Sequence, residues 1–257
     1  MNIGLIPMSA KPYHLGHHLL VQFAALGVIG DEINRVEGPQ NDVVYVFVSF
    51  SGRGTKTSRK GEVPIQGETP VYGSDMRYIW SSLLIPNLRL PNNVEILTPD
   101  DGIPASPIRC VFDILDSVYS AKLEGREELT LPHAKLDVDI SELTIHIYSD
   151  EHDIDANYPD SYLETRYPGM LNAASSPALV KVGVKRNSTV NISGTKMRQF
   201  LCDGDKDKFI ELLPPLPRDV ATEVYEVLST SVARSCPRSV WQHKTESLVR
   251  EYVRSLI

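Results

Sequence analysis

The sequence is poor in cysteine: Cys110, Cys202 and Cys236 are the only three among 257 residues, they lie far apart, and no CxxC pair occurs. Small secreted domains use paired cysteines as a framework, and zinc knuckles need closely spaced ones. Neither a disulfide framework nor a zinc knuckle is therefore predicted, and a reducing compartment fits the composition best.

Long hydrophobic runs are missing as well. The longest, such as Val43 to Phe50, are far shorter than the roughly 20 residues that a helix needs to cross a bilayer. The first residues, MNIGLIPMSA, contain no basic segment of the kind that opens a signal peptide. The pattern predicts a cytoplasmic protein with no membrane partner.

Positive charge is not in excess either, because 26 Lys and Arg are outnumbered by 33 Asp and Glu, which gives a formal net charge of -7. An acidic chain offers no general attractive field to nucleic-acid phosphates, so a nucleic-acid partner is not expected. The 42% of hydrophobic residues is ordinary for a globular protein and is enough to bury a sizeable core.

Short apolar runs alternate with helical patterns over the first 203 residues. The predicted strands are Ile3 to Pro7, Val43 to Phe50, Val94 to Leu97, Leu143 to Tyr148 and Leu179 to Val184, and the predicted helices begin at His14, Gly73, Ile108 and Ser193. This alternation is typical of an α/β fold, so we expect residues 1–203 to form a Rossmann-like domain: an open parallel five-stranded sheet with helices on both faces. Residues 204–257 contain only helical patterns and are predicted to form a helical C-terminal extension packed on that domain.

A pair of histidines follows the first predicted strand, in the stretch IPMSAKPYHLGHH. His14 and His17 are three residues apart at a helix start, so both imidazoles would lie on one face. The free amides of a helix N-terminus attract anions, and Gly16 would let a phosphate approach the backbone. An HxGH string arises by chance in about one sequence of this composition in a hundred, and a pair of capping or surface histidines is the alternative. His18 points to another face and is expected to have a structural role.

A second motif, NISGTKMR, directly follows the fifth predicted strand. Ser193 is a good N-cap for the helix behind it. Arg198 falls in the second turn of that helix, from which a guanidinium can reach back to a phosphate held by the amides of Gly194 and Thr195. The alternative is a plain capped helix with a solvated arginine.

At these two motifs the chain resembles the HxGH nucleotidylyltransferase superfamily, which includes NMN, pantetheine-phosphate and sulfate adenylyltransferases and several cytidylyltransferases. KPYHLGH and ISGTKMR match its HxGH and S-[SG]-T-x-x-R motifs in order and in their places after strands one and five. The SGT form is closer to archaeal-type NMN adenylyltransferases and ATP sulfurylases than to the RTxGISTT form of cytidylyltransferases. A looser likeness, through GSDMRYIWSSLL and IYSDEHDIDANY, is to adenylyltransferase-like proteins of tailed phages, for which the cytoplasm would be that of the host.

The resemblance implies transfer of AMP from ATP to a small phosphorylated acceptor, with release of pyrophosphate. His14 and His17 would stabilise charge growing on the α-phosphate, and Lys11 and Arg198 would hold the β and γ phosphates. Mg²⁺ would be carried by the nucleotide, so no metal site on the protein is expected. The nucleotide-binding residues would be Met8, Ser9, Ala10, Gly16, Ser193, Gly194 and Thr195. NMN, which would give NAD, is the first acceptor that the resemblance suggests, and a homo-oligomer is left open.

The loop after Phe50, SGRGTKTSRKGEVPIQGETP, is polar and cationic. It leaves the carboxyl end of a strand, where it could close over phosphates, so we expect its cations to bind the acceptor. These cations are Arg53, Lys56, Arg59 and Lys60. A solvated loop is the alternative. Neither this loop nor the segment 100–140 matches the family pattern, and such regions usually shape the acceptor pocket, so the acceptor stays open.

Three other functions remain alternatives. A cytidylyltransferase acting on a phospho-alcohol would share both motifs. A class I aminoacyl-tRNA synthetase fragment has a similar HIGH motif, but 257 residues without a basic C-terminal region leave little room for tRNA recognition. A non-catalytic nucleotide-binding module on the same fold would bind ATP without releasing pyrophosphate.

Overall fold

The computed structural model describes residues 1–29, 35–59, 61–66, 68–185 and 192–233. The chain forms two compact units, each of them assembled from separate stretches. The first consists of Met1–Ala10, Leu15–Phe50 and Arg89–Ile192, and the second of Lys11–His14, Ser51–Leu88 and Ser193–Ile257. The predicted boundary between residues 203 and 204 lies inside the second unit.

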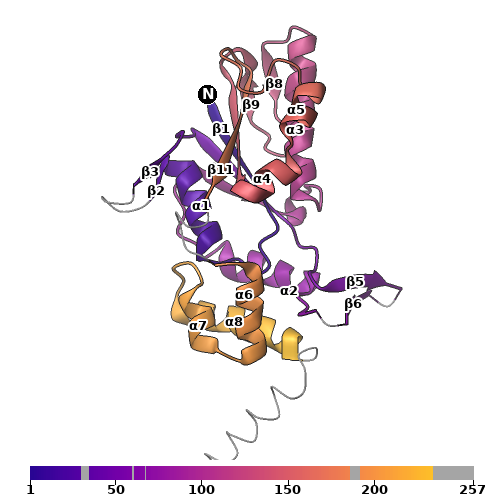
Figure 1. Cartoon of the computed structure of the whole chain (residues 1–257), viewed down its shortest axis with the longest axis vertical. Helices are drawn as coiled ribbons and strands as arrows, with labels where there is room; N and C mark the ends of the chain where they lie inside the picture. The colour runs from indigo at the N-terminus through magenta and orange to yellow at the C-terminus, as the bar shows by residue number, and fades with distance from the viewer. Residues whose placement is uncertain (30–34, 60, 67, 186–191, 234–257) are drawn as a thin grey trace, which may run out of the picture. The chain divides into compact units, whose positions relative to one another are not determined.

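The first unit contains the predicted α/β sheet (Figure 1). Its five strands are β1 (Asn2–Met8), β4 (Val43–Val48), β7 (Val94–Leu97), β10 (Thr144–Asp150) and β11 (Ala178–Val184). They lie in the order β11-β10-β1-β4-β7, and every neighbouring pair is parallel. This Rossmann-like arrangement confirms the predicted fold class, because each of the five predicted runs became one strand of the sheet.

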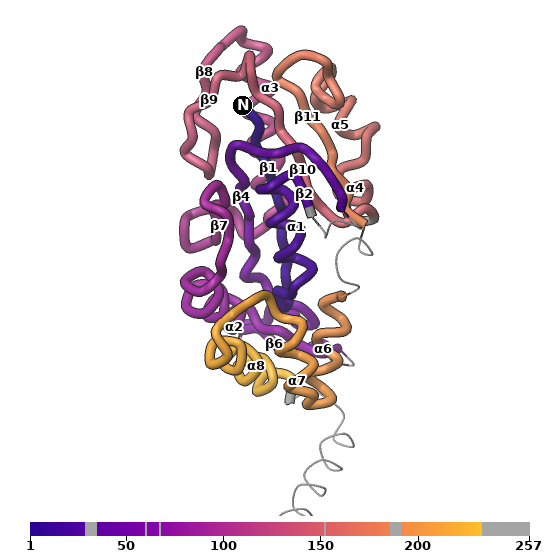
Figure 2. The backbone as a smooth tube through the Cα atoms, turned by 90° about the vertical axis from the view of Figure 1, so that its left-hand side faces the viewer, coloured from indigo at the N-terminus to yellow at the C-terminus, as the bar shows by residue number. Residues whose placement is uncertain are grey.

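Helices cover both faces of this sheet (Figures 1 and 2). Helix α1 (Leu15–Leu26) contacts β1, β4 and β10, while α3 (Pro107–Leu123) packs on β1 and β4. The main core cluster combines alternate sheet residues such as Ile3, Leu5 and Ile147 with the apolar stripe of α3. The strand residues in this cluster lie on one face of the sheet, two positions apart, and they meet the apolar stripe of α3, as an α/β layer requires. The short helices α4 (Glu151–Asn157) and α5 (Asp160–Arg166) follow β10.

Smaller elements fill the segments between the strands. Two antiparallel pairs are β2 (Val28–Ile29) with β3 (Val36–Glu37), and β8 (Glu128–Thr130) with β9 (Asp137–Asp139). Single 3-10 turns span Pro99–Asp101 and Ile140–Glu142. The segment 100–140, which matched no family pattern, thus consists of α3 and the β8–β9 hairpin.

The second unit contains the remaining helices and one hairpin. Its helices are α2 (Gly73–Tyr78), continued by a π-helical stretch η1 (Ile79–Leu84), then α6 (Gly194–Asp203), α7 (Lys206–Glu211) and α8 (Arg218–Ala233). The loop expected after Phe50 is in part a hairpin of β5 (Thr55–Ser58) and β6 (Gly61–Pro64), which corrects that prediction. A tight turn explains it, because Ser58 Oγ donates to the carbonyl of Gly61, which has a φ of 106°.

Two expectations drawn from composition concern the cysteines and the membrane. Cys110 is a free, buried thiol, and Cys236 lies outside the described residues. Within the described part of the chain, no helix is both long enough and apolar enough to cross a bilayer.

A buried polar network links α1 to the sheet in the first unit. Asn41 donates from Nδ2 to the carbonyl of Ala24 (2.6 Å) and to the hydroxyl of Tyr148 (2.7 Å). Its Oδ1 lies 2.8 Å from Nδ1 of His146, whose pKa is lowered by burial and which is therefore the neutral donor. Gly4 makes room for this amide, since a Cβ there would lie 3.1 Å from Asn41 Nδ2. One side chain thus fixes both the last turn of α1 and strand β10.

Replacing Asn41 with alanine should lower the free energy of unfolding by about 2–4 kcal/mol, because it leaves several buried polar groups without a partner. Urea denaturation would measure the loss. Asn92→Ala is the matched control, because Asn92 is exposed and should cost less than about 0.5 kcal/mol. Equal stability of the two variants would contradict the assignment of this network to the core.

Candidate active site

The sheet of the first unit has a topological switch point between β1 and β10. Strands β4 and β7 follow on one side of β1, whereas β10 and β11 lie on its other side. Pairing between β1 and β10 ends at Leu5 with Ile147, although both strands run three residues further, to Met8 and Asp150. On its other side, β1 stays paired with β4 as far as Met8, and β10 stays paired with β11 as far as Asp150. In open α/β sheets, ligands bind at such a switch point, beyond the carboxyl ends of the strands. Of the predicted nucleotide-binding residues at the end of β1 and just after it, Met8 and Ala10 are buried and Ser9 is exposed.

The histidine motif lies at the start of α1. His14 directly precedes the helix and is buried, Gly16 is in the first turn, and His17 is partly exposed. His18 is buried, and burial lowers its pKa, so that it is neutral. Burial is consistent with the structural role expected for it, which stays a prediction. By division into units, His14 belongs to the second unit and His17 to the first.

The second motif forms the N-terminus of α6. The Ser193 side chain accepts a hydrogen bond from the Lys196 amide (3.2 Å), which confirms the predicted N-cap. Met197 and Leu201 are buried, and the helix ends at Gly204 with a φ of 63°. The amides of Gly194 and Thr195 therefore lie in the first turn, where helical amides have no carbonyl partner within the helix.

Arg198 joins this helix to the stretch before the histidine motif. Its Nη1 donates to the carbonyl of Lys11 (2.9 Å), 187 residues away, and its Nη2 donates to Thr195 Oγ1 (3.1 Å). Gly194 allows the close approach, because a Cβ there would lie 3.1 Å from the Lys11 carbonyl oxygen and 3.3 Å from Arg198 Nη1. The guanidinium thus reaches back to the first turn of its helix, and its contact with a phosphate there stays a prediction.

In this part of the second unit, the charge of Arg53 acts on two other cations, Lys11 and Arg198. The Lys11 Nζ donates to Ser51 Oγ (2.6 Å) and to the carbonyl of Gly52 (3.4 Å). Burial, and then the charge of Arg53, lower the pKa of Lys11 to about 8. The same two causes lower the pKa of Arg198. Cations held together and partly desolvated are unfavourable in isolation, and an anion bound among them would relieve both costs.

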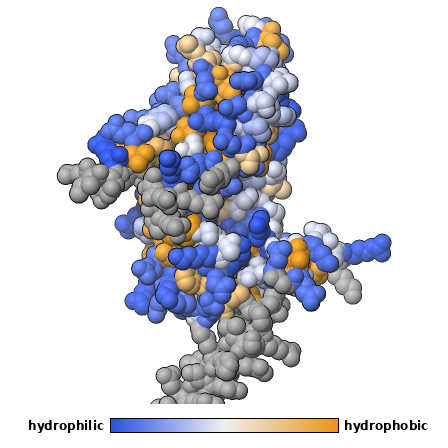
Figure 3. Space-filling model, in the orientation of Figure 1, coloured by the Kyte–Doolittle hydropathy of each residue, from blue (hydrophilic) through white to orange (hydrophobic). Residues whose placement is uncertain are grey.

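The structure divides the four loop cations that were predicted to act together. Arg53 is fixed by two backbone hydrogen bonds to Val71, both 2.8 Å, and acts on Lys11 and Arg198. Lys56 and Arg59 are exposed on the β5–β6 hairpin and form no ion pair with any described residue. Figure 3 shows hydrophilic side chains at the far end of this hairpin. Lys60 lies outside the described residues.

Two residues that act on Lys11 were not predicted from the sequence. Ser51 binds Lys11, and the Glu62 carboxylate is the acid that raises the pKa of Lys11. The two glycines of SGRG were the available signal, because paired glycines often mark a constrained turn. No local pattern indicated Glu62.

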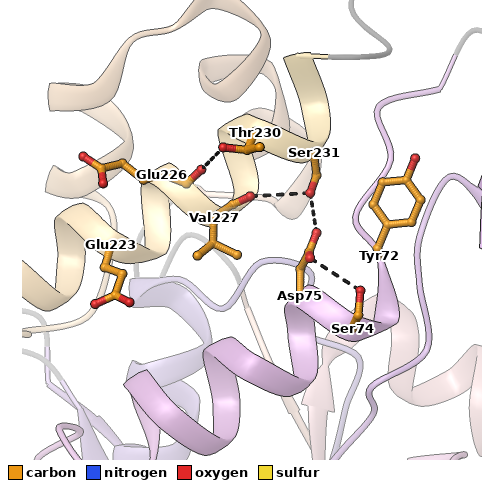
Figure 4. A pocket seen from close by; sticks show the side chains of 8 residues that line it. All are labelled: Tyr72, Ser74, Asp75, Glu223, Glu226, Val227, Thr230 and Ser231. Carbon is orange, nitrogen blue, oxygen red and sulfur yellow. Dashed lines mark hydrogen bonds between the residues drawn. The ribbon is translucent and has the colours of Figure 1, made fainter.

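A separate cavity of about 620 Å³ lies between α2 and α8 (Figure 4). Its lining residues are Tyr72, Ser74, Asp75, Glu223, Glu226, Val227, Thr230 and Ser231. Ser231 donates to Asp75 across it. Three carboxylates and no cation line this cavity, which is the wrong charge for a phosphate. This cavity is therefore not a candidate phosphate site.

Metal ligands were not expected on the protein. Within the described ranges, no three His, Cys, Asp or Glu side chains are grouped so that they could hold a metal ion.

Comparison with known proteins gives no relative: no protein-family model matches the chain, and no match is found among curated proteins or solved structures.

Proposed function

We propose that the protein is a nucleotidylyltransferase that transfers AMP from ATP to a small phosphorylated acceptor and releases pyrophosphate. One observation carries the proposal: the Arg198 guanidinium bridges the Lys11 carbonyl and Thr195, so that two sequence motifs predicted to bind phosphates meet. A capped helix with a solvated arginine would not need this contact.

The chemistry of the second unit suits the terminal phosphates of a nucleotide. Helix N-terminal amides at Gly194 and Thr195 favour an anion, and a guanidinium can bind two phosphate oxygens at once. Lys11 and Arg53 add two further positive charges nearby. A triphosphate carries several negative charges close together, so it could interact with all of these groups.

In the proposed reaction, an oxygen of the acceptor's phosphate attacks the α-phosphorus of ATP in line with the departing pyrophosphate. One O–P bond forms and the bond between the α-phosphorus and the bridging oxygen breaks. No protein side chain becomes a covalent nucleophile. His14 and His17 would stabilise charge on the α-phosphate and bridging oxygen, and Mg²⁺ carried by the nucleotide would neutralise the leaving group.

The donor and acceptor are proposed from the resemblance. The SGT form of the second motif favours ATP over CTP, and NMN is the first acceptor to test. A cytidylyltransferase acting on a phospho-alcohol is the closest rival, because it would use the same arrangement of phosphate-binding groups.

Coupled pyrophosphate release should identify the substrates. We expect ATP with Mg²⁺ and one acceptor from a panel of NMN, phosphopantetheine, FMN, sulfate, phosphocholine and glycerol 3-phosphate to give release, with NMN fastest. Faster release with CTP and a phospho-alcohol would replace the donor and acceptor but keep the class. Amino-acid-dependent ATP/pyrophosphate exchange would indicate a synthetase fragment. ATP binding with no release for any acceptor would indicate a non-catalytic module.

A further inference from the structure

The Glu62 side chain joins the β5–β6 hairpin to the first turn of α2. Its Oε1 accepts a hydrogen bond from Thr55 Oγ1, and its Oε2 accepts one from the Gly73 amide, each 2.7 Å long. Gly73 is the first residue of α2, where amides lack partners within the helix and a carboxylate is favoured. Both oxygens of this carboxylate are thus held in defined positions.

The same carboxylate lies against the turn that leads into the hairpin. A Cβ at residue 52 would clash with Glu62 Oε1 and Thr55 Oγ1, so only glycine leaves room for the carboxylate. Gly54, with a φ of 64°, closes the turn on the other side of Arg53. The backbone of Arg53 is therefore fixed between two glycines and the bridge to Val71.

This turn also binds Lys11. The Nζ of Lys11 is hydrogen-bonded to Ser51 Oγ and to the Gly52 carbonyl. The charged groups that face Lys11 are Arg53 in the turn and Glu62 on β6, and Arg198 of α6 holds its carbonyl. Glu62 raises the pKa of Lys11, whereas burial and Arg53 lower it.

We propose that Glu62 is a positioning residue of the anion site: its carboxylate, held by Thr55 and the Gly73 amide, keeps the Ser51–Arg53 turn in the position to which Lys11 is bound. It would not touch the phosphates itself, because a carboxylate repels them. The inference deepens the proposed function, since it assigns a residue that prepares the same phosphate-binding lysine. In physical terms, the acid compensates part of the cost of placing Lys11 beside Arg53.

Glu62→Gln tests the charge with little change of shape. With Lys11 titrating at about pH 8, binding of inorganic pyrophosphate to the wild-type protein should weaken as the pH rises through that value, because the amine loses its proton. In Glu62→Gln this loss should begin about half a pH unit lower, the effect expected of one partly screened charge. Calorimetric titration between pH 7 and pH 10 would measure both curves.

Glu68→Gln is the matched control. It removes the same charge from the same unit, but Glu68 acts on Arg198, which stays protonated over this range. Its curve should match the wild type. Gly52→Ala keeps all charges but leaves no space for the carboxylate, so it should move the curve in the same direction as Glu62→Gln.

The titration of Lys11 can also be followed without a ligand, by the pH dependence of its reaction with an amine-specific reagent, read by mass spectrometry. If Glu62→Gln leaves this titration unchanged, the positioning role is overturned. If pyrophosphate binds to no form of the protein but the Lys11 titration shifts as expected, the positioning role stands and the proposed function loses its support.

Discussion

Replacing His17 with alanine is expected to lower acceptor-dependent pyrophosphate release by at least about a hundredfold, because one charge-stabilising group at a phosphoryl-transfer site contributes several kcal/mol in the transition state. His17 is partly exposed at the start of α1, so the substitution should leave the free energy of unfolding within about 0.5 kcal/mol of the wild type. Steady-state kinetics and urea denaturation would measure the two quantities.

Gln22→Ala on the same helix is a suitable control for His17, since it also shortens a partly exposed polar side chain of α1. It should leave turnover unchanged. Activity of His17→Ala within threefold of the wild type, at normal stability, would remove the histidine motif from the proposed mechanism.

Arg198→Ala should weaken ATP binding by at least about thirtyfold, as charge-assisted hydrogen bonds contribute about 2–3 kcal/mol each when one partner is truncated. The loss has two sources: the phosphate contacts of the guanidinium, and its hydrogen bond to the Lys11 carbonyl, which positions that stretch. Arg198→Lys should recover only part of the affinity, because an ammonium cannot copy the two-pronged geometry. Calorimetry with ATP would measure all three proteins.

Lys196→Ala provides the control for charge. Lys196 is exposed on the same helix, two residues from Arg198 and therefore on a different face, and its loss removes one positive charge without removing the bridge. ATP affinity that fell equally in both variants would show a general field effect. Wild-type affinity and turnover in Arg198→Ala would reduce the second motif to a capped helix.

The sheet could be predicted because its signals are local. The run VVYVFV is long, β-branched and apolar on both faces, as a central parallel strand must be, and it became β4. The β5–β6 hairpin could not, since TKTS and GEVP have neither a hydrophobic face nor a usual hairpin turn sequence. The helix beginning at Gly73 was predicted at its correct start, but nothing in its period indicates the change to π geometry at Ile79.

At the candidate site, too, features that depend on neighbouring residues could be predicted, whereas contacts between residues far apart in the sequence could not. The N-cap at Ser193 and the backward reach of Arg198 follow from helix geometry within a few residues. The contact between Arg198 and Lys11 joins residues that no sequence pattern connects, and the partners of Lys11 depend on how a turn forty residues later is folded. Long-range contacts of polar groups have no periodicity, so they could not be predicted.

The second unit draws its residues from three stretches of chain, and the contacts of Lys11 with Ser51 and Arg198 span 40 and 187 residues. Each such contact requires a long loop to be closed before any interaction compensates the lost chain entropy. The parallel sheet of the first unit must close long loops too, but it buries a large apolar core in return. The polar contacts around Lys11 offer no such gain, and we therefore expect them to assemble late in folding, on chain segments whose ends the sheet already holds in place.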